Sequence, residues 1–514
     1  MKIFSGLLMF TTIFFTSCQK QMKQENLPKL YSEQYRPQIH FSPPKNWMND
    51  PNGMFFLDGE YHLFYQHYPD SNVWGPMHWG HAVSNDLVHW RNLPIALFPD
   101  SLGLIFSGSC VVDVNNTSGL GTKEQPPVVA IFTQHLMEGE KAGRHDFQTQ
   151  GIAYSIDKGA TWNMYDGNPV IKNSGKHDFR DPKVMWHEPS KQWVMILAVK
   201  DHVELYGSPD LKQWELMSDF GINYGNHKGV WECPDLFMMK DDGGKNQWVM
   251  LVSINPGGPQ GGSATQYFIG DFDGKKFTPQ DSITRWVDYG ADNYAGVTWS
   301  NIPEKDGRRI FLGWMSNWQY AQIVPTEQWR SALTIPRILS LTNIENNLVL
   351  ASNPVTELLT LKGEESSFQF TVDENFTDNG PIDLPSTPIQ MNFNIELSTG
   401  STFKIEFSNE TGDRLLIGLD STNQFYIDRT QTGLIDFSKD FTSVHYAKRL
   451  STKNKIDINL LMDASSIELF ADNGTLVMTD LIFPKTPLNH FKMVATKGNL
   501  KADLKIYTLK SIWK

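Results

Sequence analysis

Short apolar runs separated by polar turns fill most of the chain. The segments FFLDGEYHLFYQ (55–66), VMWHEPSKQWVMILAV (184–199) and IPEKDGRRIFLGWMS (302–316) each join two apolar strands through a turn that contains Gly or Pro. This arrangement is typical of β-hairpins. Because no long amphipathic helix pattern interrupts the hairpins, the pattern predicts an all-β protein.

A second pattern repeats within the first two thirds of the chain. The segments SNDLVHW (84–90), SIDKGATW (155–162) and SPDLKQW (208–214) each combine a Ser, a nearby Asp and a terminal Trp after an extended run. They lie roughly 50 to 70 residues apart, a period expected of repeated four-stranded units. The range 36–345 has room for about five such units, which predicts a five-bladed β-propeller.

The composition and the pattern of strands change after this range. Residues 360–514 contain alternating strands such as SFQFTV (367–372) and TFKIEF (402–407), few tryptophans and no Asp…Trp repeat. Short alternating strands between turns predict a β-sandwich. Residues 19–35 are polar, rich in Gln and Lys, and are expected to form a tether.

The N-terminus has the form of an export signal. Lys2 precedes a short apolar run, residues 3–17, that ends in small residues just before Cys18. The run is too short for a permanent membrane span. A cysteine at this place resembles a bacterial lipoprotein signal, so residues 1–18 predict a lipid anchor at Cys18 and a place in the cell envelope. A plain signal and a secreted protein are the alternative, because Phe15 departs from the usual aliphatic residue.

Composition and charge exclude several other functions. The formal net charge of −12 argues against nucleic acid as a partner, and it limits membrane contact to the proposed anchor. Sixteen tryptophans suit a protein that binds sugars, although most of them are expected in the core. Only Cys110 and Cys233 remain after Cys18; two buried thiols are preferred to one disulfide bridge.

Histidines could suggest a metal site, but their pattern does not support one. His62, His67, His78 and His81 lie on expected strands rather than on one helical face, and no acid completes a ligand set. The Gly-rich stretch PGGPQGGS (256–263) does not join a strand to a helix and is expected to be a loop. The sequence therefore predicts neither a metal nor a cofactor.

Three acids occupy matching places in the repeat. Each lies next to or near a proline and just before an apolar strand: Asp50 in NWMNDPNGMFF (46–56), Asp181 in FRDPKVMW (179–186) and Glu232 in WECPDLFMM (231–239). The first strand of every propeller blade lines the central channel, so equivalent positions should converge at one end. Carboxylates placed there are costly unless chemistry uses them.

Paired carboxylates that flank a cleft are the machinery of glycoside hydrolysis. Glu232 lies between Trp231 and Cys233, an apolar setting expected to keep it protonated as the general acid. Asp50 lies near Asn49, Asn52 and main-chain N–H groups, which are expected to keep it ionised.

These segments also resemble glycoside hydrolase family 32, the β-fructosidases (levanases, exo-inulinases and invertases). The resemblance covers nearly the whole mature chain and rests on seven ordered motifs: WMNDPNG (47–53), YQHYP (65–69), WGPMHWGHA (74–82), FSGS (106–109), RDPK (180–183), WECPD (231–235) and GWMSNW (313–318).

The resemblance implies a role for each matching residue. Asp50 would be the nucleophile, Glu232 the general acid/base and Asp181 the stabiliser of the transition state. The positions expected to line the fructose pocket are Asn49, Gln66, Trp74, Phe106, Ser107, Arg180 and Trp318.

The implied activity is a retaining, exo-acting β-fructofuranosidase that releases terminal fructose from levan or inulin, and also from sucrose. Endo-acting inulinases of the family tend to carry Glu where this chain has Asp50, and a propeller funnel is closed at its deep end. Three alternatives remain: an inverting glycosidase for other furanose polymers, a catalytically silent fructan-binding protein, and a fructosyl transferase. The preference among levan, inulin and sucrose stays open.

Overall fold

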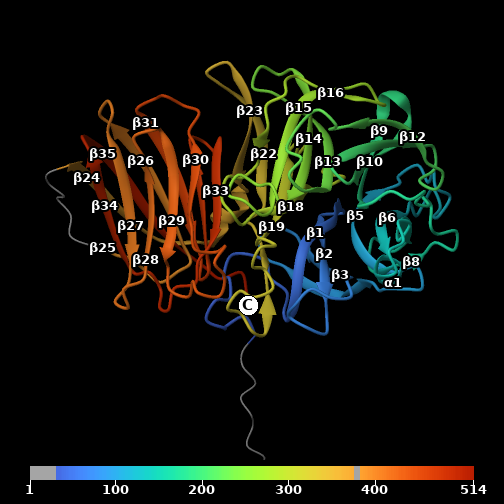
Figure 1. Ribbon diagram of the computed structural model, residues 1–514, viewed down its shortest axis with the longest axis horizontal. Helices are drawn as coiled ribbons and strands as arrows, with labels where there is room; N and C mark the ends of the chain where they lie inside the picture. Colours follow the sequence, from blue (N-terminus) through green and yellow to red (C-terminus); the bar gives the residue numbers. More distant parts are fainter. Residues whose placement is uncertain (1–29, 375–381, 514) are drawn as a thin grey trace, which may run out of the picture.

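The computed structural model describes residues 30–374 and 382–513. The expected signal, Cys18 and most of the expected tether therefore lie outside the described residues. The described chain is almost entirely β-structure, which confirms the all-β prediction. It forms two parts that lie side by side, an N-terminal part built around β1–β23 and a C-terminal part built from β24–β35 (Figure 1).

The N-terminal strands form five sheets of four or five strands. The first sheet contains β1 (Asn46–Leu57), β2 (Glu60–Tyr68), β3 (His78–Ser84), β4 (Arg91–Leu97) and β20 (Trp329–Arg330). The second contains β5 (Leu104–Val112), β6 (Val128–His135), β7 (Gln148–Ser155) and β8 (Asn163–Met164). The third contains β9 (Phe179–His187), β10 (Gln192–Val199), β11 (His202–Ser208) and β12 (Glu215–Phe220).

The remaining two sheets complete this part. The fourth contains β13 (Val230–Lys240), β14 (Asn246–Asn255), β15 (Ala264–Phe272), β16 (Phe277–Pro279) and β17 (Arg285–Trp286). The fifth contains β18 (Tyr294–Thr298), β19 (Arg309–Met315), β21 (Ala332–Leu333), β22 (Arg337–Ile344) and β23 (Asn347–Pro354). Helix is confined, in the described residues, to α1 (Met137–Lys141) and the 3₁₀ turns at Glu188–Ser190 and Thr356–Leu361.

The first strand of each sheet faces a common axis. Strand β1 contacts β5, β5 contacts β9, β9 contacts β13, β13 contacts β18, and β18 contacts β1 again. This closed ring is the arrangement of a β-propeller, as the repeat predicts. Strand β20 pairs in parallel with β1, so a late segment of the chain joins the first sheet. We interpret each sheet as one blade.

The C-terminal part is a sandwich of two six-stranded sheets. One contains β24 (Lys362–Asp373), β35 (Asn499–Leu509), β26 (Ile389–Leu397), β31 (Lys455–Met462), β32 (Ser466–Ala471) and β33 (Leu476–Leu481). The other contains β25 (Ile382–Asp383), β34 (His490–Lys497), β27 (Thr402–Ser408), β28 (Arg414–Leu419), β29 (Gln424–Gln431) and β30 (Val444–Lys448).

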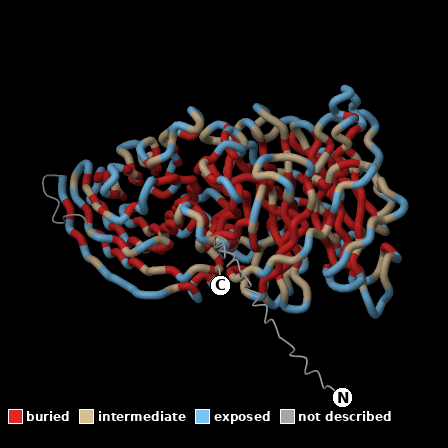
Figure 2. Tube along the Cα trace, turned by 90° about the horizontal axis from the view of Figure 1, so that it is seen from below, coloured by how far each residue is buried: buried red, intermediate tan, exposed pale blue. Residues whose placement is uncertain are grey.

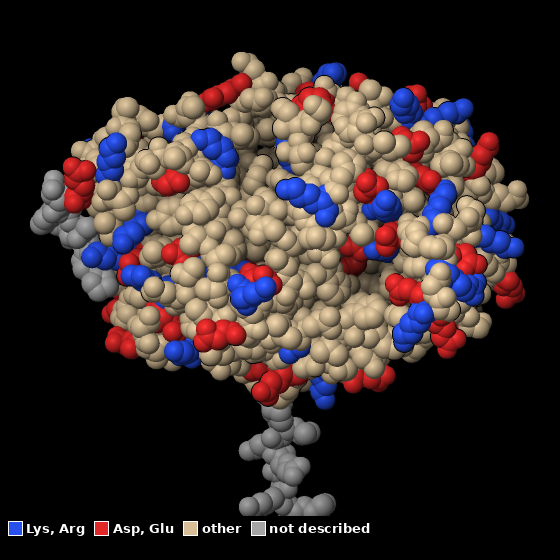
Figure 3. Space-filling model, viewed as in Figure 1, with Lys and Arg blue, Asp and Glu red and all other residues tan. Residues whose placement is uncertain are grey.

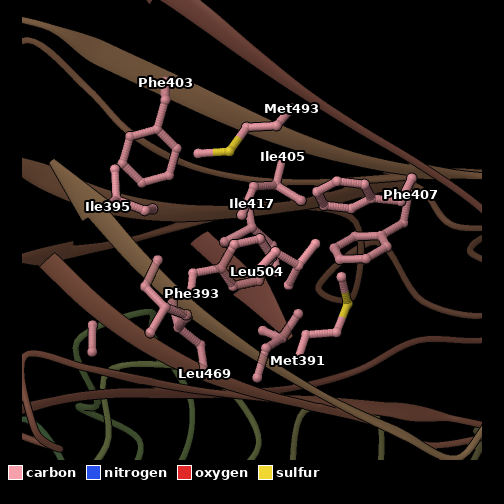
Figure 4. Packing of buried hydrophobic residues seen from close by; sticks show 14 of the residues in the cluster. Met391, Phe393, Ile395, Phe403, Ile405, Phe407, Ile417, Leu469, Met493 and Leu504 are labelled. Carbon is pink, nitrogen blue, oxygen red and sulfur yellow. The ribbon is translucent and has the colours of Figure 1, made fainter. Parts of the chain in front are cut away.

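Alternation along the strands explains the sandwich. Much of β35 alternates exposed and buried residues, as expected when one face of a sheet covers a core. Phe393, Phe403, Ile417 and Leu504 meet between the sheets (Figure 4). Buried residues run through the interior of both parts (Figure 2). The fifth propeller sheet runs to Pro354, beyond residue 345 where the sequence places the end of the first domain.

Charged side chains of both signs are scattered over the face drawn in Figure 3, without a large field of one sign. Among the described residues, no helix has the length and apolar character needed to cross a membrane.

Candidate functional site

The three acids lie inside the first strands of their sheets, not in turns before them. Asp50 belongs to β1, Asp181 to β9 and Glu232 to β13. The expectation that each acid precedes its apolar strand is therefore wrong. The Pro and Asn residues beside the acids instead accompany irregular pairing. A β-bulge re-aims a side chain without ending the strand, and it explains how a strand can contain so polar a segment.

Each acid lies at such a bulge. The pairing of β1 shifts between Met48 and Pro51. On β9 the pairing resumes only at Lys183, which leaves Asp181 unpaired in the ladder. On β13 the shift begins directly after Glu232.

All the catalytic and fructose-pocket residues that the resemblance implies line one pocket of about 290 Å³. The ten residues are Asn49, Asp50, Gln66, Trp74, Phe106, Ser107, Arg180, Asp181, Glu232 and Trp318. The convergence of the three acids on one end of the propeller is thus present in the structure.

Asp50 is held by two side-chain donors. Asn49 Nδ2 donates to one carboxylate oxygen at 2.9 Å, and Ser107 Oγ donates to the other at 2.7 Å. Burial nevertheless raises the pKa of Asp50, and the charge of Glu232 adds to the rise, although both hydrogen bonds oppose it. That Asp50 is ionised stays a prediction. Asn52 Nδ2 reaches the main-chain oxygen of Asp50 (3.4 Å) rather than its carboxylate, so of the two expected asparagines only Asn49 donates to the carboxylate.

Glu232 lies in a charged and polar setting. Arg180 donates from Nε and Nη2 to Oε1 at 3.0 Å each, and the Tyr294 hydroxyl donates to Oε2. The expected apolar setting is wrong because adjacent strand residues point to opposite faces. Trp231 accordingly points away and donates to the main-chain oxygen of Asn226 at 2.7 Å.

Asp181 is the most enclosed of the three acids. Its side chain accepts a hydrogen bond of 3.0 Å from the main-chain N–H of Cys233. Burial raises the pKa of Asp181 to about 7; the charges of Glu232 and Asp50 add to the rise, while Arg180 opposes it. Asp181 therefore releases its proton at a higher pH than an isolated carboxylic acid does.

Cys233 joins two of the acids. Its Sγ lies 3.5 Å from Oδ2 of Asp50 and 3.5 Å from Oδ2 of Asp181, so these oxygens are at most 7.0 Å apart. Cys233 and Cys110 are both buried and free, which confirms the prediction of two thiols.

Aromatic rings form the walls of the pocket. Trp74 meets Phe106 edge to face at a centroid distance of 6.2 Å, and Trp318 stacks on buried Trp47 at 5.8 Å. Such walls can cover the apolar face of a sugar while the acids and amides bind its hydroxyls.

Sequence reasoning missed seven residues that also line the pocket: His135, Glu140, Gln148, Asp178, Asn255, Tyr294 and Gln322. A signal for Tyr294 exists, since NYAGVTW (293–299) places it before an apolar strand, as with the three acids. No local pattern marks His135, which stacks on Phe106 at 4.2 Å and whose Nδ1 accepts from Gln148 Nε2 at 3.2 Å.

The histidines considered for a metal site have other contacts. Nδ1 of His62 and Nε2 of His81 lie 3.1 Å apart, and burial lowers the pKa of both imidazoles. His67 Nδ1 lies 2.7 Å from the main-chain oxygen of Trp47. Within residues 30–374 and 382–513, no three His, Cys, Asp or Glu side chains are grouped so that they could hold a metal ion.

Comparison with known proteins agrees with the geometry. Residues 40–354 match the profile described as the glycosyl hydrolases family 32 N-terminal domain, and residues 355–510 match that of the family 32 C terminal. A levanase of Bacillus subtilis is 46% identical over 492 residues, which cover 94% of this chain and 72% of the levanase. An extracellular exo-inulinase of Aspergillus niger is 38% identical over 525 residues, which cover 94% and 96% of the two chains.

Solved structures give the same result. The exo-inulinase of Aspergillus awamori superposes with a TM-score of 0.86 at 35% identity, covering 94% of this chain and all of the inulinase. A fructofuranosidase of Schwanniomyces occidentalis complexed with fructose gives 0.84 at 36% identity, covering 94% and 100%. The chain therefore belongs to glycosyl hydrolase family 32 and is a glycoside hydrolase of the β-fructosidase type.

Proposed function

We propose that this β-fructosidase is a retaining exo-hydrolase, which removes terminal fructose units from levan or inulin and also cleaves sucrose. The observation that carries the proposal is the size and lining of the pocket. A cavity of about 290 Å³ stands at the lower limit of small-molecule sites and suits one sugar unit. The relatives named exo-inulinase and levanase support the same substrate class.

The first step in the proposed mechanism forms a bond to Asp50. A carboxylate oxygen of Asp50 attacks the anomeric carbon of the terminal fructose, while Glu232 gives its proton to the glycosidic oxygen. The glycosidic bond breaks, the rest of the substrate leaves as an alcohol, and a fructosyl ester on Asp50 remains. Asp181 binds hydroxyls of the fructose, whose ring gains positive charge in the transition state.

The second step restores the enzyme. A water molecule gives a proton to Glu232 and attacks the anomeric carbon, fructose is released, and Asp50 becomes a free carboxylate again. Arg180 and Tyr294 contact Glu232, and we propose that they hold its carboxyl group toward the glycosidic oxygen through both steps.

The distribution of products over time tests whether the enzyme attacks the chain end (exo-hydrolysis). Levan and inulin digests should contain free fructose from the first minutes while the polymer size falls slowly. Early short oligosaccharides with late fructose would show an open cleft and an endo-hydrolase. A product whose anomeric configuration is inverted would support the inverting glycosidase, binding without release would support the silent binder, and fructose transfer to added sugar would support the transferase.

We also propose export and lipid anchoring at Cys18. The relatives named extracellular support export, and they leave a plain secreted form as the alternative. Labelling of cells with a radioactive fatty acid tests the anchor, and recovery of the unlabelled wild-type protein from the medium would overturn it.

A further inference from the structure

Two segments that supply pocket residues are held by the sandwich domain. The first, residues 288–294, ends at Tyr294, whose hydroxyl donates to Glu232. The second, residues 317–322, carries Trp318 and Gln322 of the pocket wall. Strand β33 lies on the side of the sandwich that faces the propeller (Figure 1), and it contacts β19 and β23.

The first segment lies along β33, the last strand of its sheet. Main-chain N–H groups of Tyr289 and Asp292 donate to the oxygens of Val477 (2.8 Å) and Thr479 (3.0 Å). In the opposite direction, the N–H of Leu481 donates to the Asp292 carboxylate at 2.8 Å. The approach is so close that a Cβ at position 290 would lie 2.2 Å from the oxygen of Thr479, which requires glycine there. The propeller thus covers the edge of the sandwich sheet.

A buried arginine of β29 joins the two segments. Arg429 Nη1 donates to Asp292 Oδ2 at 2.7 Å, and Nη2 donates to the Tyr320 hydroxyl at 2.9 Å. That hydroxyl in turn donates to Asp292 Oδ1 at 2.7 Å. All three side chains are buried, and Arg429 is completely enclosed. A planar guanidinium can bridge a carboxylate and a hydroxyl at fixed angles, whereas a lysine could not reproduce both contacts.

Two further hydrogen bonds lie between the pocket and the Arg429 cluster, which consists of Arg429, Asp292 and Tyr320. Asn317 Nδ2 donates to the main-chain oxygen of Ala291 at 2.8 Å, so the two segments also contact each other directly. The N–H of Trp318 donates to Ser263 Oγ at 3.1 Å. A shift of Tyr320 or Asp292 would therefore reach Trp318 within two residues on one segment and Tyr294 within two on the other.

We propose that Arg429 is a positioning residue for the sugar pocket, which acts from the sandwich domain through Asp292 and Tyr320. It does not reach the substrate. It fixes the wall at Trp318 and the hydroxyl of Tyr294 that holds Glu232. The inference rests on the proposed function, because it assigns the wall to the fructose unit.

The sharpest test is Tyr320→Phe, which removes one hydroxyl and keeps the ring. Its matched control is Tyr206→Phe, which also removes a buried tyrosine hydroxyl that donates to a carboxylate, that of Glu204 at 2.5 Å; both residues lie on β11, which supplies no residue of the pocket. Loss of one or two hydrogen bonds that position the wall should raise KM for fructose release about three- to tenfold in Tyr320→Phe. Tyr206→Phe should keep the KM of the wild type, even if it lowers the unfolding midpoint as much as Tyr320→Phe does.

Arg429→Lys is the second variant, with Arg449→Lys as its control. Arg449 is a buried arginine paired with Asp472 inside the sandwich, at 2.6 Å. Arg429→Lys should raise KM and also lower kcat, because both segments lose their support, and it should weaken fructose binding in calorimetry; Arg449→Lys should change none of these. Should Arg429→Lys fail to fold, Tyr320→Phe decides.

The experiments distinguish a failure of the proposed function from a failure of the inference about Arg429. A folded wild-type protein that releases no fructose would overturn the proposed function. An active wild type whose Tyr320→Phe and Arg429→Lys variants match their controls in KM, kcat and fructose affinity would overturn this inference alone.

Discussion

Replacing Asp181 by asparagine should stabilise the protein at neutral pH while it damages the site. Asp181 is only 6% exposed, and burial raises its pKa from 3.8 to about 7. Between these pH values the folded protein keeps a proton that the unfolded chain has released. The free energy of unfolding therefore falls as pH rises, by about 1.4 kcal/mol for each pH unit.

The structure sets the size of the effect. The interval between 3.8 and about 7 is roughly three pH units, so ionised Asp181 costs at most about 4 kcal/mol at pH 8. Asparagine carries no charge and keeps an oxygen for the N–H of Cys233. Asp181→Asn should hence equal the wild type in stability near pH 4 and exceed it progressively up to pH 7, with a constant gain above.

Urea unfolding followed by tryptophan fluorescence, at intervals from pH 4 to pH 8, measures the difference. Asp58→Asn serves as the control, because Asp58 is an exposed partner of Lys158 and its loss should leave the pH dependence unchanged. A stability difference between Asp181→Asn and wild type that did not change with pH, or a variant that was less stable at pH 8, would refute the reasoning.

Three further predictions concern the catalytic acids, Tyr294 and the proposed anchor. Asp50→Ala should abolish hydrolysis and Glu232→Ala should lower kcat about 10²- to 10⁴-fold on natural substrates, with partial rescue of the latter by azide on a substrate with a good leaving group; near-normal turnover of either variant would contradict the roles. Tyr294→Phe should lower kcat more than it raises KM, measured as initial rates, because its hydroxyl contacts Glu232; an unchanged kcat would show a purely structural hydroxyl. Cys18→Ala should release the enzyme from membranes or block its maturation, as followed by fractionation and immunoblotting, and an unchanged membrane fraction would contradict the anchor.

The convergence of the acids was predictable from sequence because it follows from repetition. Asp50, Asp181 and Glu232 each precede an apolar run at the start of a repeat, and a propeller brings the starts of its first strands to one axis. No knowledge of side-chain contacts is needed for that step. The alternation of apolar and polar residues in the sandwich strands was predictable for the same reason, since it depends only on the period of the sequence pattern.

The electrostatics of the site were not predictable in this way. Neighbours in sequence suggested an apolar place for Glu232, yet its contacts come from Arg180 and Tyr294, 52 and 62 residues away. For Asp50, the sequence suggested local donors, while the structure adds the Ser107 hydroxyl from the second sheet and a burial that raises the pKa of the carboxyl. Sequence neighbours on a strand point to opposite faces, so they say little about what surrounds a side chain. The Arg429 cluster lies further still from any local pattern, since Arg429 and Asp292 are 137 residues apart.

Bulges in the first strands place the site residues of the propeller. All five first strands are irregular near their starts: at Asn49 and Asp50 in β1, Phe106 and Ser107 in β5, Asp181 and Pro182 in β9, Cys233 and Pro234 in β13, and Ala295 and Gly296 in β18. An unbroken strand would pair these groups in the ladder and alternate their side chains between its faces. A bulge frees one residue to point along the axis at the cost of local strain, visible as the positive φ of Asp181 (65°) and Cys233 (45°). Such strain persists only where the surrounding sheets fix the backbone. The irregular positions therefore include Asp50 and Asp181 and lie directly beside Glu232, and the fifth lies directly beside Tyr294, which also lines the pocket.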